Sequence, residues 1–307
     1  MGTNIYARLH PDNKERSKLA LKIKDAIMTN EPDMYYQIEN ILEEYKEKYP
    51  DKFVLIFHKQ NVGGTKNIYD IFMRSRGKYI ACLEGDDYWI DENKLQKQVD
   101  FLENNNDYLG VSHIIEARDL QGNYISRSPS SPKIVGKDAT IDLFLKGYYF
   151  SAVATVYRNI YLDKSNDYSI YYRAHKYVGD LTLCMLLLDK GKIKVLDETM
   201  SVYRCRRVEG ESNYNSIRNA FEQYDDHIQL LNAVNKYFNY KYDFSREYIE
   251  RSVSVFLYSI KYDQFYKFCD TFKKVPNKTK VLFYALLPGN FIKRVFLKCR
   301  SLIKTKQ

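Results

Sequence analysis

The first part of the chain alternates helical and strand-like patterns of hydrophobic residues. Residues 35–49 repeat apolar positions at helical spacing, and Pro50 then ends the predicted helix. Residues 53–57 form a continuous apolar run, which is typical of a buried parallel strand. Residues 67–74 return to a helical pattern, and residues 79–83 form a second apolar run. This order predicts a strand–helix–strand unit, whose crossover is almost always right-handed.

The α/β pattern continues to about residue 212, and a purely helical pattern follows it. The next predicted elements are a helix over 94–104, a strand over 109–117, a loop over 127–137, a helix over 141–145, a strand over 150–157, a helix over 181–188 and a strand over 195–203. From about residue 216 onward there is no strand pattern. We therefore predict an α/β domain over 1–212, with a mostly parallel sheet flanked by helices, and a helical region over 213–307.

Composition restricts the class of protein and the compartment. Apolar residues make up 45% of the chain and charged residues 28%, so a packed core is expected and wholesale disorder is not. The five cysteines are widely spaced, which argues against a disulfide framework or a structural zinc site and favours a reducing compartment. The N-terminus has no apolar signal core, and the longest apolar run, 281–287, is too short to span a bilayer. We expect a cytoplasmic protein, free or bound to a membrane surface.

The positive charge is concentrated in the C-terminal tail. The net charge is +9, and no acidic residue follows Asp270, while ten basic residues do. A protein that binds nucleic acid more often spreads basic residues over its binding face, so we expect no nucleic acid partner. In the tail, apolar residues from Phe291 to Ile303 share one helical face, and basic residues surround the other. This pattern favours a basic amphipathic helix in an anionic membrane interface; the alternative is a terminal helix docked on the domain.

Three carboxylates directly follow the predicted strand over 79–83. Glu84, Asp86 and Asp87 would lie at the carboxyl end of this strand, where open α/β sheets bind their ligands. Carboxylates packed this closely repel one another unless a cation lies between them, and hard oxygen ligands suit Mg²⁺ or Mn²⁺. Such an ion would join the carboxylates to a substrate phosphate. The alternative is an ordinary polar turn after a strand.

An ordered set of short motifs extends this hypothesis. The chain resembles the family 2 glycosyltransferases from about residue 37 to residue 212, and each motif lies in the order that the family has. The matching segments are Asn61–Asn67, Arg76–Ile80, Glu84–Trp89, Lys94–Gln98, Gly179–Leu181, Leu188–Lys192 and Ser201–Arg204. The resemblance implies a GT-A-like (Rossmann-like) fold and a nucleoside diphosphate sugar donor.

The resemblance implies a role for each acidic residue. Asp86 and Asp87 would hold the metal and the diphosphate, with Glu84 in the first position of the family's D-x-D pattern. Asp180 would be the catalytic base of an inverting reaction, taking the proton from an acceptor hydroxyl. The alternative for Asp180 is a helix N-cap, because Gly179 and Asp180 before an apolar run also make a good capping sequence.

Weaker candidates surround these carboxylates. Lys66 and Asn67 would contact the nucleotide, or they are simply the start of a helix. Arg204 would meet the diphosphate, or it is a surface arginine at a strand end. Trp89 and His175 are candidates for the acceptor side. His113, within a predicted strand, is instead expected to be a core residue.

The N-terminal segment departs from the family pattern. Members open with two strands, the second of which usually carries an aspartate that meets the nucleotide base, and residues 1–36 contain neither pattern. Even so, the expected function is inverting transfer of a sugar to a glycan or lipid-linked acceptor in bacterial surface polysaccharide synthesis, at the inner face of the membrane. The first alternative is a non-catalytic remnant that binds glycan or a partner glycosyltransferase. The second is a membrane or nucleic-acid binding module, favoured only by the tail.

Overall fold

The computed structural model divides the chain into two compact units. The structure describes residues 34–51, 54–56, 58, 60–84, 87–119, 121–129, 131–205 and 218–286. Among these, the first unit holds the residues up to 205 except 145–147 and 173–175, and the second unit holds those short segments together with 218–286. The predicted boundary near residue 212 lies outside the described residues.

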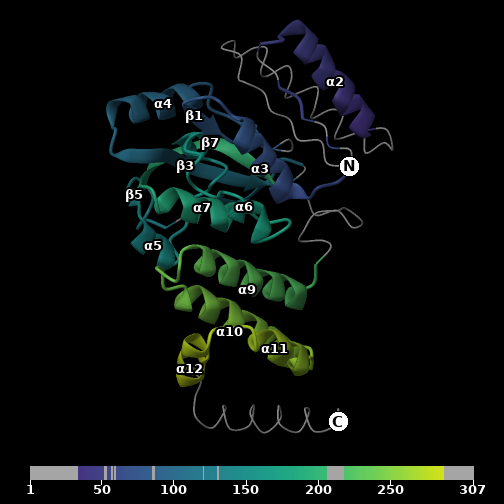
Figure 1. Cartoon of the computed structure of the whole chain (residues 1–307), viewed down its shortest axis with the longest axis vertical. Coiled ribbons are helices and arrows are strands. Elements are labelled where there is room, and N and C mark those ends of the chain that lie inside the picture. Colours follow the sequence, from purple (N-terminus) through teal and green to yellow (C-terminus); the bar gives the residue numbers. More distant parts are fainter. Residues whose placement is uncertain are drawn as a thin grey trace. The chain divides into compact units, whose positions relative to one another are not determined.

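The first unit is built on a mixed sheet (Figure 1). The strands run in the order β1 (Tyr79–Ala81), β6 (Val156–Arg158), β3 (Tyr108–Arg118), β7 (Lys192–Arg204) and β2 (Tyr88–Trp89). Two further strands lie off this path, with β4 (Tyr124–Ser128) paired to β3 and β5 (Asp138–Ala139) paired to β7.

The prediction of a mostly parallel sheet was wrong for the described residues. β3 and β7 pair in parallel, and the other five pairings are antiparallel. A parallel pair needs a long crossover connection, which the chain between β3 and β7 provides with its helices. β3 and β4 are instead joined by a tight turn at Gly122, which has φ 87°, and such a turn makes an antiparallel pair.

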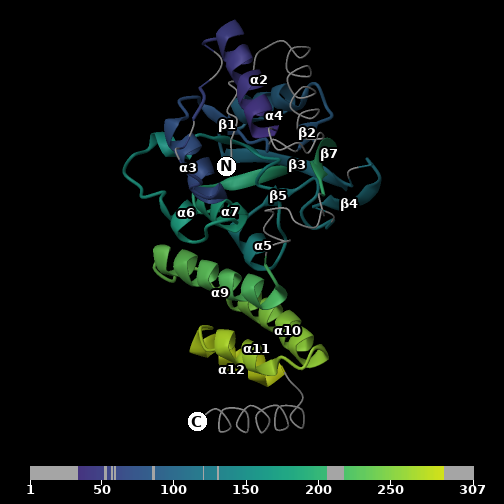
Figure 2. The same ribbon diagram turned by 90° about the vertical axis from the view of Figure 1, so that its right-hand side faces the viewer.

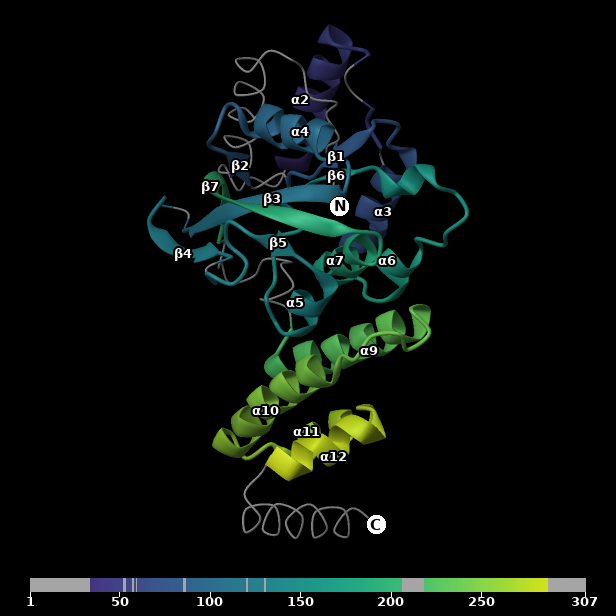
Figure 3. The same cartoon turned by 90° about the vertical axis from the view of Figure 1, so that its left-hand side faces the viewer.

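Helices cover both faces of this sheet (Figure 3). On one face, α4 (Lys94–Asn104) packs Leu102 against Val111 and Val156, all of them buried. On the other face lies α7 (Asp180–Leu188), in which every residue from Thr182 to Leu188 is buried. Both helices confirm the sequence prediction. The other helices among the described residues of the first unit are α2 (Met34–Lys48), α3 (Gly64–Arg74) and η1 (Ile160–Leu162). Two more, α5 (Ile141–Leu145) and α6 (Ile170–Arg173), each end at the first residue of a short segment assigned to the second unit.

The predicted strand over 53–57 is not found. Its described residues, 54–56, belong to no strand, and Val54 has 62% of its surface exposed. Among the described residues, β1 therefore pairs with β6 alone, and the predicted strand–helix–strand unit is absent. β1 is also shorter than predicted, because the chain leaves the sheet after Ala81 to form the acidic turn.

Within residues 218–286 the second unit is helical, and its helices are drawn green to yellow in Figure 2. They are α9 (Ala220–Tyr237), α10 (Ser245–Lys261), α11 (Phe265–Phe272) and α12 (Asn277–Leu286). Their core is aromatic: the Phe256 ring lies 5.3 Å from that of Phe268 and 5.9 Å from that of Phe283, centroid to centroid. A helical region after residue 216 was predicted, and residues 218–286 confirm it. In the part of the chain described here, no helix has the length and apolar character needed to cross a membrane.

Candidate functional site

The acidic turn after β1 is held against the end of β7. Asp87 donates its backbone N–H to the carbonyl oxygen of Glu84 at 3.1 Å, which closes the turn. The Asp87 carboxylate accepts a hydrogen bond from the backbone N–H of Arg204 at 3.0 Å. Asp86, the central residue of the predicted metal site, lies outside the described residues. The two flanking carboxylates therefore come from a turn whose position is set by β7.

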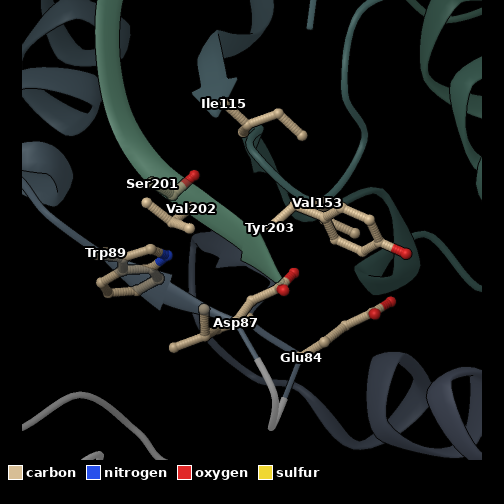
Figure 4. Close-up of a pocket in the computed structure, with 9 residues that line it drawn as sticks. Glu84, Asp87, Trp89, Ile115, Val153, Ser201, Val202 and Tyr203 are labelled. Carbon is tan, nitrogen blue, oxygen red and sulfur yellow. The ribbon is translucent and has the colours of Figure 1, made fainter. Parts of the chain in front are cut away.

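Glu84 and Asp87 line one small pocket (Figure 4). Figure 4 shows both carboxylates together with the Tyr203 ring, and the Trp89 indole across from Glu84. The residues that line it are Leu83, Glu84, Asp87, Trp89, Ile115, Val153, Ser201, Val202 and Tyr203. Its cavity volume is about 10 Å³, which is the size of a single water molecule or ion. In this conformation the pocket fits an ion and not a whole sugar nucleotide.

The residues present are chemically suited to a hard divalent cation. Glu84 and Asp87 offer carboxylate oxygens to the same pocket, and such oxygens are preferred by Mg²⁺ and Mn²⁺. Within the described ranges, no group of three or more His, Cys, Asp or Glu side chains is arranged to hold a metal ion. With Asp86 outside those ranges, a metal site at this turn stays a prediction.

Asp180 is the first residue of α7 and is not its N-cap. The cap position is held by Gly179, whose carbonyl oxygen accepts the first helical hydrogen bond from Leu183 at 2.8 Å. Across the described residues, no hydrogen bond is made to the Asp180 carboxylate. The capping alternative therefore does not describe this residue, and the carboxylate is available to a ligand.

The Asp180 carboxylate lies near the acidic turn. Burial raises the pKa of the Tyr171 phenol well above its usual range, and the negative charges of Asp180 and Glu84 both add to the shift. Burial likewise raises the pKa of Cys82 to about 12, with Glu84 and Asp180 again contributing. Because such charge effects fade with distance, their action on the same two groups places both carboxylates in the neighbourhood of Tyr171 and Cys82. The structure thus brings together two residues that are 96 positions apart in the sequence.

The environment of Asp180 favours its protonated form. The side chain reaches solvent, yet protein atoms surround most of the carboxylate and remove much of its hydration. This loss of water raises the pKa of Asp180 above its ordinary value. A carboxylate of raised pKa is a stronger base when ionised, which suits the role predicted for this residue.

Two glycines determine how closely the segment before Asp180 packs. A Cβ atom on Gly179 would lie 2.5 Å from the Tyr171 ring, so no larger residue fits there without moving that buried tyrosine. A Cβ atom on Gly63 would lie 2.9 Å from the Lys176 side chain. Thr65 also donates its hydroxyl to the Lys176 carbonyl oxygen at 2.9 Å. The turn before α3 is therefore attached to the segment that leads to Asp180.

Lys66 and Asn67 make contacts within the protein. Lys66 forms an ion pair with Asp70, one helical turn along α3. Asn67 is 4% exposed, and its side-chain oxygen lies 3.1 Å from Nε2 of His58. These contacts are those of residues at a helix start, which was the alternative interpretation. A role for either residue in donor binding stays a prediction.

The remaining candidates are placed in different environments. Trp89, a candidate for the acceptor side, lines the pocket of Glu84 and Asp87. The guanidinium of Arg204 lies over the Tyr88 ring at 6.0 Å, beside the acidic turn. His175 lies 3.5 Å from an Asp226 oxygen within the second unit, and burial lowers its pKa.

His113 is a core residue, as expected. It is fully buried, and its Nδ1 donates to the carbonyl oxygen of Ile114 at 2.8 Å. Burial lowers the pKa of His113 to about 3, so the ring is neutral at physiological pH.

Two polar residues near the site were not singled out from the sequence. Lys94 and Gln98 are 1% and 0% exposed, although both lie on α4, whose apolar positions were expected to face inward. The Lys94–Gln98 motif carries both residues, and their spacing of four places them on one helical face. That spacing was visible in the sequence, but it carried no information about burial.

A family model matches part of the chain. Residues 36–165 match the family described as Glycosyl transferase family 2. An uncharacterised protein of Mycobacterium tuberculosis (strain ATCC 25618 / H37Rv) is 32% identical over 169 residues, which cover 53% of this chain and 45% of that protein. An uncharacterised glycosyltransferase of Rickettsia bellii (strain RML369-C) is 39% identical over 88 residues, which cover 28% of this chain and 12% of that protein.

A solved structure supports the fold. The crystal structure of S. aureus TarS matches with a TM-score of 0.50 at 14% sequence identity, covering 86% of this chain and 45% of that one. At this identity the similarity concerns the fold alone. Together with the family match, it supports the predicted α/β, GT-A-like fold with a helical C-terminal region. The chain spans less than half the length of the mycobacterial relative and of TarS.

Proposed function

Since residues 36–165 of this chain match glycosyltransferase family 2, we propose that the protein transfers a sugar from a nucleoside diphosphate sugar to an acceptor hydroxyl, with inversion at the anomeric carbon. This proposal rests mainly on one observation, which is that Asp180 lies in the neighbourhood of the acidic turn. The carboxylates of the turn and that of Asp180 would have different roles. Glu84 and Asp87 lie in one pocket at the end of β1, and Asp180, at the start of α7, acts with Glu84 on the same buried residues, Tyr171 and Cys82.

Asp180 is the proposed base in a single displacement. Its carboxylate takes the proton of the acceptor hydroxyl while that oxygen forms a bond to the anomeric carbon. The bond from the anomeric carbon to the diphosphate oxygen breaks, and the nucleoside diphosphate leaves with that electron pair. Attack and departure occur on opposite faces of the carbon, so the configuration inverts. The raised pKa of Asp180 and its lack of a hydrogen-bond donor among the described residues support this role.

Donor binding is proposed for the acidic turn. Glu84, Asp86 and Asp87 would hold Mg²⁺ or Mn²⁺, with Asp86 and Asp87 as direct ligands. A bound ion supplies positive charge that neutralises the diphosphate leaving group. Arg204, next to the turn, would contact the diphosphate from the protein side, and Lys66 and Asn67 would contact the nucleotide.

The acceptor is proposed to be a glycan or a lipid-linked glycan of bacterial surface polysaccharide synthesis. The support is the tail, in which basic residues accompany an apolar helical face. Such a segment would hold the enzyme at the inner, anionic face of the cell membrane, where a lipid-linked acceptor is available. The tail lies outside the described residues, so this part of the proposal rests on the sequence.

A screen of nucleoside diphosphate sugars with Mn²⁺ tests the proposal, with release of nucleoside diphosphate as the readout. Asp86→Asn should lower release by roughly a hundredfold or more, because a metal ligand is lost. Its Tm without metal should hold or rise, since the substitution relieves repulsion between carboxylates. Asp100→Asn, on the exposed side of α4, is the matched control and should keep full activity. Full activity in Asp86→Asn would exclude the metal site.

A second function is favoured by one observation. Residues 54–56 form no strand, and β1 pairs with β6 alone among the described residues, so part of the family's donor half is not seen. The chain would then be a non-catalytic glycosyltransferase module that binds a glycan or a partner glycosyltransferase. Glycan binding without release of nucleoside diphosphate from any donor in the screen would support this alternative.

A further inference from the structure

A buried lysine lies behind the pocket of the acidic turn. Lys94 is the first residue of α4, and only 1% of its surface is exposed. Its backbone N–H donates to the carbonyl oxygen of Asp91 at 3.2 Å, so the start of the helix is anchored to the segment that follows β2. Lysine is almost never fully buried without a partner, so its partners need explanation.

Gln98 holds the amino group of Lys94 from one side. Its Oε1 accepts a hydrogen bond from the Lys94 Nζ at 2.8 Å. The amide Nε2 of Gln98 donates to the Val111 carbonyl oxygen at 2.6 Å and to the Ala154 carbonyl oxygen at 3.1 Å. Both carbonyl groups belong to the sheet or its immediate connection, so the glutamine joins the lysine to the rigid part of the fold.

The Trp89 indole lies on the other side of the same amino group. The Lys94 Nζ is 4.5 Å from the centroid of the Trp89 ring, which is a cation–π distance. The Trp89 backbone pairs with Ser201 of β7, and its ring lines the pocket with Glu84 and Asp87. A line of contacts therefore runs from the sheet through Gln98 and Lys94 to one wall of the pocket.

The surroundings of Lys94 make burial of its amino group unfavourable for folding stability. The titratable groups that face it are Cys82, Asp91 and His113. Burial lowers the pKa of Lys94 to about 7, because Cys82 and Asp91 compensate only in part for the lost hydration. An apolar side chain of the same length would fill this space without that penalty. The amino group is therefore better explained by what it contacts.

We propose that Lys94, held by Gln98, is a positioning residue that fixes the Trp89 indole as the wall of the donor pocket and thereby sets donor affinity. The proposal rests on the proposed function, because it takes the pocket of Glu84 and Asp87 as part of the donor site. Lys94 does not line the pocket, so it acts through Trp89.

Steady-state kinetics with the donor found in the screen separate positioning from catalysis. Lys94→Met removes the amino group and keeps a side chain of similar length. We expect a roughly five- to tenfold rise in donor KM with kcat changed less than about twofold, because a wall contacts the donor equally before and during the reaction. Lys97→Met is the matched control, since Lys97 is an exposed residue of the same helix, and it should change neither parameter.

Trp89 is the only tryptophan in the chain, so its fluorescence reports on this contact alone. In Lys94→Met, selective excitation of the indole should show a shifted emission maximum and stronger quenching by acrylamide, while Lys97→Met matches the wild type. In the wild-type protein, lysine labelled with ¹³C should give a nuclear Overhauser contact between its ε-methylene protons and the indole ring. This second measurement needs no variant and remains available if Lys94→Met fails to fold.

The outcomes separate this proposal from the proposed function. Absence of the Overhauser contact, or an unchanged donor KM and unchanged fluorescence in Lys94→Met, would overturn the positioning role. A fall in kcat and Tm with constant KM would also overturn it, because it would indicate packing alone. If the wild-type protein turns over no donor, the proposed function fails. In that case the pocket remains a nucleotide site only if UDP, GDP or dTDP with Mg²⁺ quenches the fluorescence of Trp89.

Discussion

Two opposing physical effects act on the charge of the Asp180 carboxylate. As the first residue of α7 it lies at the positive end of the helix dipole, which stabilises a negative charge. The surrounding protein removes water from the carboxylate and raises its pKa. The net effect is a raised pKa for Asp180. For an acid with a raised pKa, the stability that the group contributes is greatest at pH values below its pKa in the unfolded chain, and it is lost as the pH rises through its pKa in the folded protein. The ionised residue is therefore retained at neutral pH at some cost to folding, as is common for catalytic groups.

Asp180→Asn should abolish base catalysis and spare donor binding. We expect kcat to fall by roughly a hundredfold or more with little change in donor KM, because the base acts on the acceptor. In the wild type, kcat/KM should rise with pH as Asp180 ionises, with a midpoint above its ordinary pKa of 3.8. This acid limb should be missing from the variant.

The control for this prediction lies at the other end of the same helix. Asp189→Asn alters the exposed C-cap of α7 and should leave the kinetics unchanged. The Tm of Asp180→Asn at neutral pH should equal or exceed that of the wild type, by the sign argument above. A collapse of donor binding in Asp180→Asn would instead show that the residue is structural.

At the scale of elements, the turn before α3 determines how a distant segment is held. Gly63 is the N-cap of α3 with φ 85° and ψ 155°, a conformation that is essentially restricted to glycine. Asn61 supports this turn by accepting the Gly63 N–H at 2.8 Å. Through Thr65 the turn contacts Lys176, four residues before Asp180. An N-x-G turn in the sequence thus has a consequence for the position of the proposed base.

Gly63→Ala should destabilise the protein and lower kcat. The backbone strain alone is worth roughly 1–3 kcal/mol, and the new Cβ would also lie 2.9 Å from the Lys176 side chain. Thermal unfolding and steady-state kinetics measure the two effects. Gly64→Ala is the adjacent control: a Cβ there meets its nearest atom at 3.7 Å, so little change is expected. Equal behaviour of the two variants would show that the turn does not hold the Lys176 segment.

For the molecule as a whole, the structure reduces the number of tail residues on which the proposed membrane binding rests. Lys273, Lys274 and Lys278 each pair with an aspartate of the second unit. Phe283 of α12 belongs to the aromatic core of that unit. Lys280 donates to the Lys273 carbonyl oxygen. The other six basic residues of the tail follow residue 286 and are Lys293, Arg294, Lys298, Arg300, Lys304 and Lys306. A truncation that tests the tail must end after α12, because an earlier one would remove part of the core.

Truncation after Leu286 should abolish binding to anionic vesicles. Flotation with liposomes that contain phosphatidylserine should carry the full chain upward at low salt and less of it at high salt, because screening acts over roughly 8–10 Å. Neutral liposomes should not bind the chain. Activity on a water-soluble acceptor analogue should persist in the truncated protein, since the carboxylates of the site lie far upstream. A full-length protein that stays at the bottom of the gradient would support the docked-helix alternative.

The periodicity of the sequence was sufficient to predict α2, α3, α4, α5, α7 and the acidic turn. α4, α5 and α7 have the predicted bounds within one residue, because each has a local apolar face or a continuous buried run. The acidic turn follows β1 as expected, since short motifs of charged residues after a strand are visible without any tertiary contact. The run over 53–57 shows the limit of this reasoning, because an apolar segment becomes a strand only when another strand pairs with it.

Pairing and burial were decided by the tertiary structure. Five of the six strand pairings are antiparallel, and no local pattern carries that information, because it depends on where distant segments of the chain return. The proximity of Asp180 to Glu84 and the burial of Lys94 behind Trp89 also arise from contacts between distant residues. The sequence by itself determined which side chains were available for chemistry. Only the fold determined which of them share a low-dielectric environment, because hydration is lost through packing and not through sequence neighbours.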